Sequence, residues 1–441
     1  MTRWPQSRGW RGRASKRHTG VFARRGLSAE EVLRRDRLGD RTPVAKPVQQ
    51  PRRNMHRLSR FAQLMKGLPR DSFQKLVDLH AGDRYVKKFG CWQQLLAMVY
   101  GQLAGVSSLR ELEAGFNQHR NHHYHLGAVE VHRSTLSNAN DGRNPMVFEE
   151  AARLLIALSA QAVSRKERKE LLYLIDSTTI ALYGRGSQWT EATKTRTRGL
   201  KVHVQFESGS QLPVHFNITS ANVNDETEGS KIAAQAGATY VYDKGYCNYA
   251  WWERIAAAGA RFVTRLKKNA AIELVSVRQV PSQAVSIAGD SVIQLANKSN
   301  RGGHKNRCRR QLRRIEVARP NDDNLVLVSN DLDASAQEIA DLYRQRWEIE
   351  LFFKWIKQHL KVKKFLGESE NAVRIQLLTA LITYLLVSLQ KVREGFPGTL
   401  WNFLTELRTG LFLRDQEESC RWRRCRHRQA DFDALQPGLF G

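Results

Sequence analysis

Apolar residues recur every three or four positions along the first patterned part of the chain, which begins near Phe61. This spacing predicts helices that each bury one face. Ser108 and Glu111 have the spacing of a capping box, so another helix is expected to begin there. The apolar positions are Phe61, Leu64, Met65, Leu68, Phe73, Leu76, Val77, Trp92, Leu95, Leu96, Val99 and Leu103. The pattern predicts that this part of the chain is helical throughout.

Near Glu170 the apolar period shortens to that of a strand. The stretch LLYLIDSTTIAL at 171–182 and two alternating stretches after it predict three successive strands. The elements expected next are a helix at 226–237, a strand over TYVYDKGY, a helix at 251–259 and a strand at 260–267. The order βββαβαβ is typical of a mixed sheet covered by helices, so the predicted fold class is α/β.

Residues 268–333 interrupt this alternation. They contain four strand-like pieces, AIELVSV, SVIQLA, RRIEVA and NLVLVS, and an arginine-rich loop that includes Arg309 and Arg310. We interpret them as a β-rich insertion with a basic surface. Two helices are predicted after it, over 343–364 and 375–391. The second is expected to be buried, because its apolar segment is too short and too broken by polar residues to span a bilayer.

Both ends of the chain are basic and lack a regular pattern. Residues 1–54 are crowded with arginine, and we expect them to be disordered. An alternative is that they are not part of the working protein, because a segment of different character begins at Met55. The expected organisation is a tail at 1–54, a helical domain at 55–168, an α/β domain at 169–391 and a second tail at 392–441.

The charge balance points to a polyanionic partner. The 441 residues include 71 Lys and Arg against 43 Asp and Glu, which leaves a net charge of +28. Such a balance most often indicates binding to nucleic acid. A membrane surface is the competing partner, but no strongly amphipathic basic segment stands alone, so we expect no membrane binding. Five scattered cysteines fit a reduced, cytoplasmic protein.

The predicted helix at 343–364 carries a charged face beside its apolar one. The residues of this face, which fall within roughly 60° of one another on a helical wheel, are Tyr343, Arg346, Glu350 and Lys357, and Lys354 and Lys361 extend the stripe. A solvated face held by ion pairs would explain the charges. A single carboxylate among cations also suits a site that holds a divalent metal ion beside a nucleic-acid backbone. This second interpretation requires further acidic residues elsewhere.

Two aspartates lie in otherwise apolar predicted strands, Asp176 in LLYLIDSTTIAL and Asp243 in TYVYDKGY. Burying a carboxylate without a partner is costly. A salt bridge or a hydrogen-bond network could compensate for one such residue. Two aspartates on strands and Glu350 on a later helix, in a strongly basic chain, favour instead a site for two Mg²⁺ ions about 4 Å apart, which is suited to phosphodiester chemistry.

These residues resemble those of bacterial insertion-sequence transposases of the DDE type. The spacing Tyr343-x2-Arg346-x3-Glu350-x6-Lys357 matches the Y-R-E-K signature of that family. The segments LIDST, ITSANVND and DKGY are similar to the surroundings of its first two acids, and 59–148 is similar to the N-terminal domain often attached to these enzymes. The resemblance covers roughly residues 55–390, and several ordered motifs of this kind rarely coincide by chance.

The resemblance implies a ribonuclease-H-like fold in which Asp176, Asp243 and Glu350 hold Mg²⁺, with Mn²⁺ able to substitute. It implies that backbone phosphates near the transposon terminus are contacted by Tyr343, Arg346 and Lys357. We expect further DNA contacts from Lys354, Lys361, Arg309 and Arg310. Family members nick DNA at the element end with water and then use the freed 3′-hydroxyl as the next nucleophile. The implied partners are terminal inverted repeats and target DNA, bound by a homodimer at the nucleoid of a prokaryotic cytoplasm.

Some family members form a DNA hairpin and stack a flipped base on an aromatic residue of the insertion. Residues 270–333 contain no Phe, Tyr or Trp, so a hairpin route is not expected unless Trp347 or another aromatic substitutes. Two alternatives to an active transposase are a nuclease of the same fold that only hydrolyses DNA and an inactive DNA-binding relative.

Other polar residues near the predicted acids receive a structural interpretation. Asp225, Glu226 and Glu228 precede a predicted helix and are expected to stabilise its N-terminal dipole. His203 and His215 lie on predicted strands and are expected to be hydrogen-bonded structural histidines.

Overall fold

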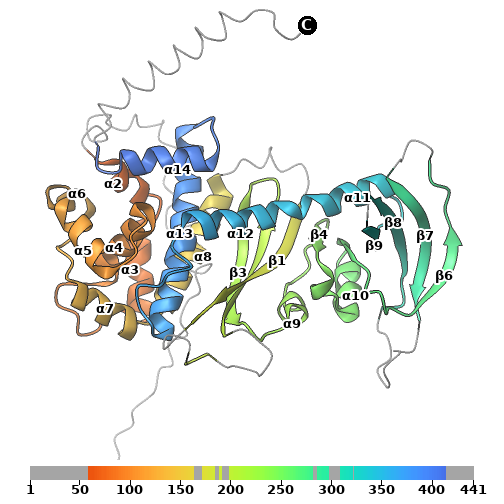
Figure 1. The fold of residues 1–441 in the computed structure, drawn as a ribbon, viewed down its shortest axis with the longest axis horizontal. Coiled ribbons are helices and arrows are strands. Elements are labelled where there is room, and N and C mark those ends of the chain that lie inside the picture. Colours follow the sequence, from red (N-terminus) through yellow and green to blue (C-terminus); the bar gives the residue numbers. More distant parts are fainter. Residues whose placement is uncertain are drawn as a thin grey trace, which may run out of the picture.

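The computed structural model describes residues 58–162, 171–183, 188–190, 198–281, 286–296, 308–320 and 322–413. The predicted tail at 1–54 and the last 28 residues of the predicted C-terminal tail, 414–441, lie outside these ranges. Helices gather at one end of the molecule and a long sheet extends to the other end, while α11 and α12 run alongside from one to the other (Figure 1).

The N-terminal part is helical, as the apolar spacing predicted. Its α-helices are α2 (Arg60–Met65), α3 (Arg70–Leu79), α4 (Cys91–Ala104), α5 (Leu109–Gln118), α6 (His123–Leu126), α7 (Arg133–Gly142) and α8 (Met146–Ala162). Every apolar position of the predicted stripes is buried. Ser108 caps α5 by accepting a hydrogen bond from the Glu111 amide at 3.2 Å, so the predicted start of this helix is confirmed.

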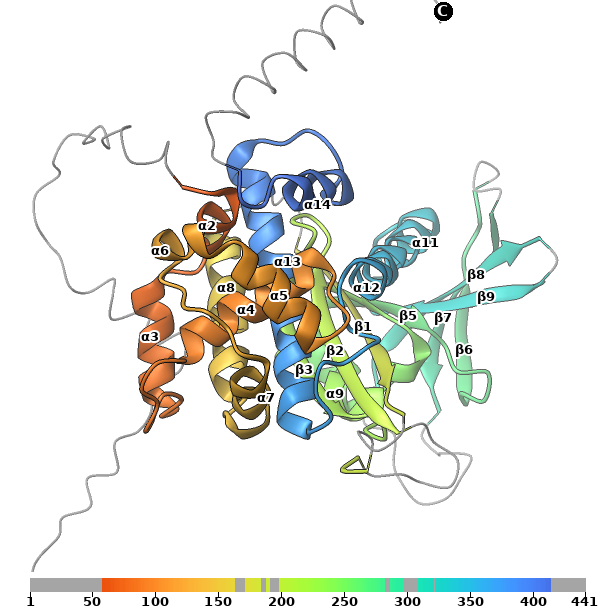
Figure 2. The same cartoon turned by 60° about the vertical axis from the view of Figure 1, so that its left-hand side comes forward.

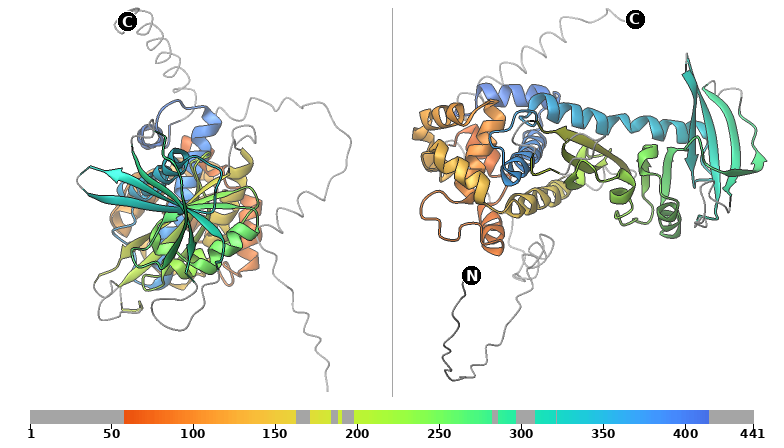
Figure 3. Two further views of the ribbon diagram at one scale, coloured as in Figure 1. Left: turned by 90° about the vertical axis from the view of Figure 1, so that its right-hand side faces the viewer. Right: turned by 60° about the horizontal axis from the view of Figure 1, so that its bottom comes forward.

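One sheet of nine strands runs through the rest of the described chain, in the order β3-β2-β1-β4-β5-β9-β8-β7-β6. Its first five strands in the sequence are β1 (Leu172–Ala181), β2 (Gly199–Glu207), β3 (Leu212–Ser220), β4 (Thr239–Tyr242) and β5 (Arg261–Arg265). Strands β1, β4 and β5 are parallel, and β2 and β3 are antiparallel to their neighbours. This is the ribonuclease-H-like arrangement that the resemblance implied. The strands fan out when the sheet is seen from its end, as a right-handed strand twist requires (Figure 3, left).

One of the two helices between these strands is shorter than predicted. Helix α10 (Tyr249–Ala257) agrees with the prediction at 251–259, but the predicted helix at 226–237 is wrong in length, because α9 spans only Asp225–Gly229. After it the backbone passes through tight turns in which Lys231 and Ile232 each bond three residues back. Ile232 is the single large apolar side chain of 226–237, so a longer helix would have no stripe to bury.

The predicted insertion does supply four strands, β6 (Ile272–Val277), β7 (Ile287–Leu295), β8 (Gln311–Arg319) and β9 (Asp322–Ser329). They form no separate sheet, because β9 pairs with β5 and continues the central one. Arg313, in β8, is buried and pairs with Asp290 in β7 at 2.5 Å. Its Nη1 also donates to the carbonyl oxygens of Leu332 and Ala334, at 2.9 and 3.0 Å, just before α11 begins. The insertion therefore fixes the start of α11.

Helices α11 (Ala336–Gln345) and α12 (Trp347–His359) replace the single helix predicted at 343–364, so that prediction is wrong at both ends and in its continuity. The two form a long rod (Figure 3, right). The rod has a break at Arg346, whose amide bonds back only three residues to Tyr343. Leu360 is extended, and the buried Gln102 of α4 accepts the Lys361 amide at 2.7 Å. Lys361 therefore lies beyond the helix and does not extend its charged face.

Helix α13 (Glu370–Glu394) joins the two halves of the molecule. It packs against α4, α7 and α8 on one side and lies beside the sheet on the other (Figure 2). Tyr384 donates to the carbonyl of Gln211, between β2 and β3, at 3.1 Å. Among the described residues it is the one helix long and apolar enough to cross a membrane, but 94% of its apolar window is buried inside the protein. The predicted buried helix is confirmed.

The predicted tail at 392–441 is wrong over its first part. Residues Leu400–Thr409 form α14, which packs on α4 and α13. Phe403, Leu404 and Leu407 are buried, so this segment has its own apolar stripe. Arg408 donates to the His359 carbonyl at 2.6 Å, which holds the end of the α11–α12 rod opposite the insertion.

Candidate active site

The pairing of β1 and β4 brings two of the predicted acids together. Ile175 in β1 lies opposite Tyr242 in parallel β4, and the next residues of the two strands are Asp176 and Asp243. Strand β4 ends at Tyr242, so Asp243 begins the turn η5 (Lys244–Tyr246). The two carboxylates therefore stand side by side where β4 ends.

Helix α12 carries the third acid to the same place. Glu350 lies in its first turn, and α12 packs over β1. Arg346 joins the two elements, because its Nη2 lies 2.7 Å from Glu350 Oε1 and its Nη1 lies 3.6 Å from Asp176 Oδ2. The side chains of Asp176, Asp243 and Glu350 are 21%, 34% and 34% exposed, so solvent and a bound chain can reach all three.

Tyr343 is held by a carboxylate in this structure. Its hydroxyl donates to Asp243 Oδ1 at 3.3 Å, and the Arg346 guanidinium lies 5.6 Å from its ring centre. Burial raises the pKa of Tyr343 to about 12, so the hydroxyl keeps its proton at neutral pH. Arg265 of β5, which the sequence reasoning missed, lies 3.6 Å from Asp243 on another side. Asp243 thus has a neutral and a cationic partner.

The electrostatics of the site favour an additional cation. Burial, together with the charges of Glu350 and Asp243, raises the pKa of Asp176 to about 6, although the Ser177 amide and Arg346 oppose this shift. Burial lowers the pKa of Arg346, but the negative charges around it outweigh burial and the pKa is raised. Three carboxylates of which two share one guanidinium are a donor set that fits a hard divalent cation.

The carboxylates are not drawn close around a single point. No three His, Cys, Asp or Glu side chains in the described ranges are placed closely enough to enclose a metal ion as they stand. Arg346 lies between Asp176 and Glu350, where it takes the role of the counter-cation. The carboxylates therefore have the chemistry that a metal ion requires, and Arg346 sets the present positions of Asp176 and Glu350.

The remaining predicted DNA-binding residues separate into two groups. Lys354 is exposed on α12, and Lys357 is partly buried near Asp176, where burial and Lys363 lower its pKa while Asp176 opposes them. Lys361 lies beyond the helix, close to Glu111 of α5. Arg309 and Arg310 lie just before β8, and Arg310 pairs with Glu253 of α10 at 2.8 Å. In the described part of the chain, no contact joins either arginine to the three acids.

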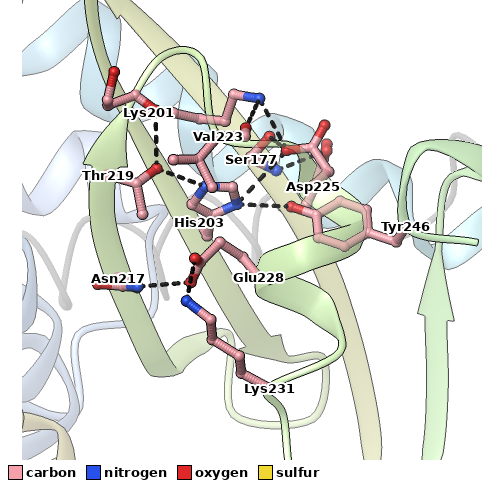
Figure 4. Close-up of polar contacts among 12 residues, drawn as sticks. Ser177, Lys201, His203, Asn217, Thr219, Val223, Asp225, Glu228, Lys231 and Tyr246 are labelled. Carbon is pink, nitrogen blue, oxygen red and sulfur yellow. Dashed lines mark hydrogen bonds and ion pairs between the residues drawn. The ribbon is translucent and has the colours of Figure 1, made fainter. Parts of the chain in front are cut away.

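A second polar cluster lies on the reverse face of β1, and sequence reasoning assigned it a different role. Asp225 contacts Ser177 of β1 as well as Lys201 and His203 of β2 (Figure 4). Asp225, Glu226 and Glu228 do lie in the first turn of a helix, as predicted, but α9 has only five residues and the Asp225 carboxylate binds the sheet, which the prediction missed. The prediction that His203 is structural is confirmed, because both ring nitrogens have partners. The available signal that Asp225 lies near the acids was the segment ITSANVND, which ends at this residue and is similar to the surroundings of the family's acids.

Comparisons with known proteins agree with one another. A family model described as a transposase DDE domain matches residues 167–386, and one described as a domain of unknown function matches 56–129. The protein y4zB of Sinorhizobium fredii, assigned as a transposase, is 42% identical over 57% of this chain and 69% of its own length. A protein of Geobacillus stearothermophilus, assigned as the transposase of insertion sequence element IS5377, is 30% identical over 59% of this chain and 68% of its own length.

A solved structure also aligns with much of the fold. The cryo-EM structure of a piggyBac transposase synaptic complex with hairpin DNA covers 88% of this chain and 87% of its own, with 11% sequence identity and a TM-score of 0.44. A similarity at that level supports no statement about this chain.

Proposed function

The chain belongs to the DDE transposases of bacterial insertion sequences, and on this premise we propose that it binds the terminal inverted repeats of its element, cuts the DNA there and joins the freed 3′-hydroxyl ends to target DNA. Enzymes of this family cleave DNA and transfer strands, so membership gives the reaction class. The net charge of +28 supports DNA as the partner.

Divalent metal ions generally serve DDE transposases, and in this chain Asp176, Asp243 and Glu350 are proposed to hold Mg²⁺, with Mn²⁺ able to substitute. The observation that carries this assignment is the convergence of three carboxylates, from two adjacent strands and one helix, on the pair Arg346 and Tyr343. When bound, such ions activate the attacking oxygen and stabilise the leaving oxygen of a phosphodiester.

Residues on the α11–α12 rod position these carboxylates and are proposed to bind the DNA end. Tyr343 holds Asp243, and Arg346 holds Glu350 and Asp176. A guanidinium binds carboxylate and phosphate in the same forked geometry, so Arg346 can exchange a carboxylate for a DNA phosphate without leaving the site. Lys354 and Lys357 lie about two and three turns beyond Arg346 along α12, where they can bind the following phosphates.

The helical region at 55–168 is proposed to bind the element end, within a homodimer that holds two ends at the bacterial nucleoid. Helix α7 supports this role, because Arg133, Ser134 and Asn138 are exposed and can hydrogen-bond to DNA. Its other end is fixed, since Asn140 accepts from Gln94 of α4 at 2.7 Å. Trp347, 58% exposed at the start of α12, is an aromatic available for base stacking.

Glu350→Gln tests the assignment of the third acid. The variant removes one negative charge and is expected to reduce both end cleavage and end joining by about 10³-fold or more, because a metal ion stabilises the reaction by several kcal/mol. Binding to end DNA without metal should be largely preserved. The matched control is Glu348→Gln, because Glu348 lies on the same helix but binds Ser208 and Gln211 at 2.7 Å. The control should retain both activities.

The assay supplies pre-cut end DNA, uncut end DNA and a target plasmid, with Mg²⁺ or Mn²⁺. Joining to the plasmid by the wild-type protein is the expected result. Cleavage without joining would identify a nuclease, and end binding without cleavage would identify an inactive relative. Cleavage retained by Glu350→Gln would remove this residue from the metal site.

A further inference from the structure

The reverse face of β1 carries a carboxylate that the proposed reaction does not use. Asp225 Oδ1 accepts a hydrogen bond from Ser177 Oγ at 2.7 Å and lies 3.2 Å from Lys201 Nζ and 3.6 Å from His203 Nδ1 (Figure 4). We infer that Asp225 is a positioning residue that fixes the two aspartates to which the proposed function assigns the metal ions. This role rests on that function.

Asp225 reaches Asp176 through Ser177. Successive strand residues point to opposite faces, so Asp176 faces α12 while Ser177 faces α9. The Ser177 amide donates to Asp176 Oδ1 at 2.8 Å, while the Ser177 hydroxyl donates to Asp225. One residue therefore carries both hydrogen bonds, and a shift of its side chain would redirect the amide that orients the Asp176 carboxylate.

Asp225 reaches the other aspartate through the turn that follows Asp243. A Cβ atom at Gly245 would lie 3.5 Å from Asp225 Oδ2, so the carboxylate packs directly against this turn. Tyr246 ends the same turn and is buried, and its hydroxyl lies 3.4 Å from His203 Nδ1, which also faces Asp225. One side chain thus contacts both the residue after Asp176 and the turn after Asp243.

The charges of this cluster are balanced on its own face. Lys201 neutralises Asp225 and also donates to the Val223 carbonyl at 2.9 Å. Burial lowers the pKa of His203 to about 4, although Asp225 opposes the shift, so the imidazole is neutral near pH 7. Its Nε2 lies 3.0 Å from Thr219 Oγ1. Asp225 lies on the face of β1 opposite Asp176, so it acts by holding the backbone and is no further metal ligand.

The test is Mn²⁺ binding by the full chain without DNA, measured by electron paramagnetic resonance. Asp225→Ala is expected to weaken Mn²⁺ binding roughly 10-fold or more, because groups that orient metal ligands typically contribute 10–100-fold. Asp225→Asn keeps the shape and an acceptor for Ser177, so it should show a smaller loss and provides a variant if the alanine form does not fold. The matched control is Glu226→Ala, since Glu226 lies on the same helix but contacts Asn248 and Lys267.

A double-mutant cycle with Ser177→Ala separates positioning from general destabilisation. If Asp225 acts through Ser177, removing Asp225 should weaken Mn²⁺ binding less in the Ser177→Ala background than in the wild type. Wild-type Mn²⁺ affinity in a folded Asp225→Ala or Asp225→Asn protein would overturn the inference, as would an equal loss in Glu226→Ala. Additive losses in the cycle would also overturn it.

Failure of the metal assignment would give a different result. Asp176→Asn would then bind Mn²⁺ as the wild type does. Weakened binding in Asp176→Asn together with unchanged binding in Asp225→Ala would overturn the positioning role alone.

Discussion

Asp176 and Ser177 are neighbours on one strand, yet they face clusters that are built in different ways. Around Asp176 three carboxylates are 21–34% exposed. Their partners from the rod are Arg346 and the Tyr343 hydroxyl, and Arg265 lies beside Asp243. Behind Ser177 the Asp225 carboxylate is 28% exposed, within the same range, but it has three partners on two strands, and His203 beside it is buried. The first cluster has three carboxylates paired with two arginines, while the second pairs one carboxylate with one lysine.

The difference between the two clusters shows which part of the fold is destabilising. Burial raises the pKa of Asp176 to about 6, so the folded protein disfavours the charged carboxylate that metal binding requires. The reverse face compensates by fixing the same stretch of β1 with a hydrogen-bonded ion pair. A site prepared for a cation is destabilising until the cation binds, and a rigid support lets the fold tolerate it.

The largest expected effect comes from amide variants of the acids on the side of β1 that carries Asp176. Asp176→Asn and Asp243→Asn should reduce DNA cleavage by about 10³-fold or more, because the charge stabilisation that a metal ion provides is lost. Asp176→Asn should unfold at the wild-type temperature or above it, because an amide pays no penalty for burying a charge. Cleavage rates and thermal unfolding followed by circular dichroism measure both. A strongly destabilised Asp176→Asn protein would contradict the comparison.

On the face of β1 that carries Ser177, the main effect of a substitution should be on stability rather than on cleavage. Lys201→Met leaves Asp225 without its cation and should lower the free energy of unfolding by about 2 kcal/mol, because a partly buried charge loses its partner. Lys268→Met is the control, since Lys268 lies 2.8 Å from Asp323 and the two side chains are 91% and 75% exposed. The control should have little effect on urea unfolding. Equal costs would show that the Asp225 pair is an ordinary surface pair.

A smaller effect is expected at Arg346, which is proposed to bind a DNA phosphate. Arg346→Ala should weaken binding to end DNA and reduce the slope of log affinity against log salt by about 1, because one phosphate contact is lost. Arg344→Ala serves as the control, since Arg344 is 70% exposed and pairs with Asp341 on another side of the rod. Fluorescence anisotropy across a salt series measures both slopes. An unchanged slope for Arg346→Ala would exclude a phosphate contact.

A further expected effect is a pH dependence of stability. The pKa of His203 is lowered to about 4 by burial, so the unfolded chain takes up a proton below about pH 6.5 while the folded chain does not. The stability that this difference provides is complete above pH 6.5 and is lost as the pH falls toward 4. His203→Gln should therefore show a shallower loss of stability over this range. A parallel pH profile would mean that other histidines account for the slope.

Local patterns predicted most of the fold and the three acids. Apolar periodicity reflects burial along single elements, so the helical stripes from Phe61 to Leu103 and the strands around Asp176 and Asp243 could be read directly from the sequence. An acid within an apolar strand is equally local. The Y-R-E-K spacing remains a prediction about roles, and the structure adds that its Tyr and Arg contact the three acids.

Contacts between distant parts of the chain could not be predicted. The end of α12 depends on Gln102, which accepts the Lys361 amide from a helix 259 residues earlier. Helix α14 has a local apolar stripe of Phe403, Leu404 and Leu407, but it was grouped with the basic residues that follow Arg414 and was therefore missed. Asp225 was assigned to a helix dipole because nothing in the sequence indicates that its carboxylate binds Ser177, 48 residues earlier.

The most direct test is to locate the metal ion. Crystals of the full chain soaked in Mn²⁺ should show an anomalous peak coordinated by Asp176, Asp243 and Glu350, at oxygen distances of about 2.0–2.3 Å, with the Arg346 guanidinium moved from its place between Asp176 and Glu350. Mn²⁺ bound elsewhere, with Arg346 still joining Asp176 to Glu350, would contradict the assignment of these three carboxylates.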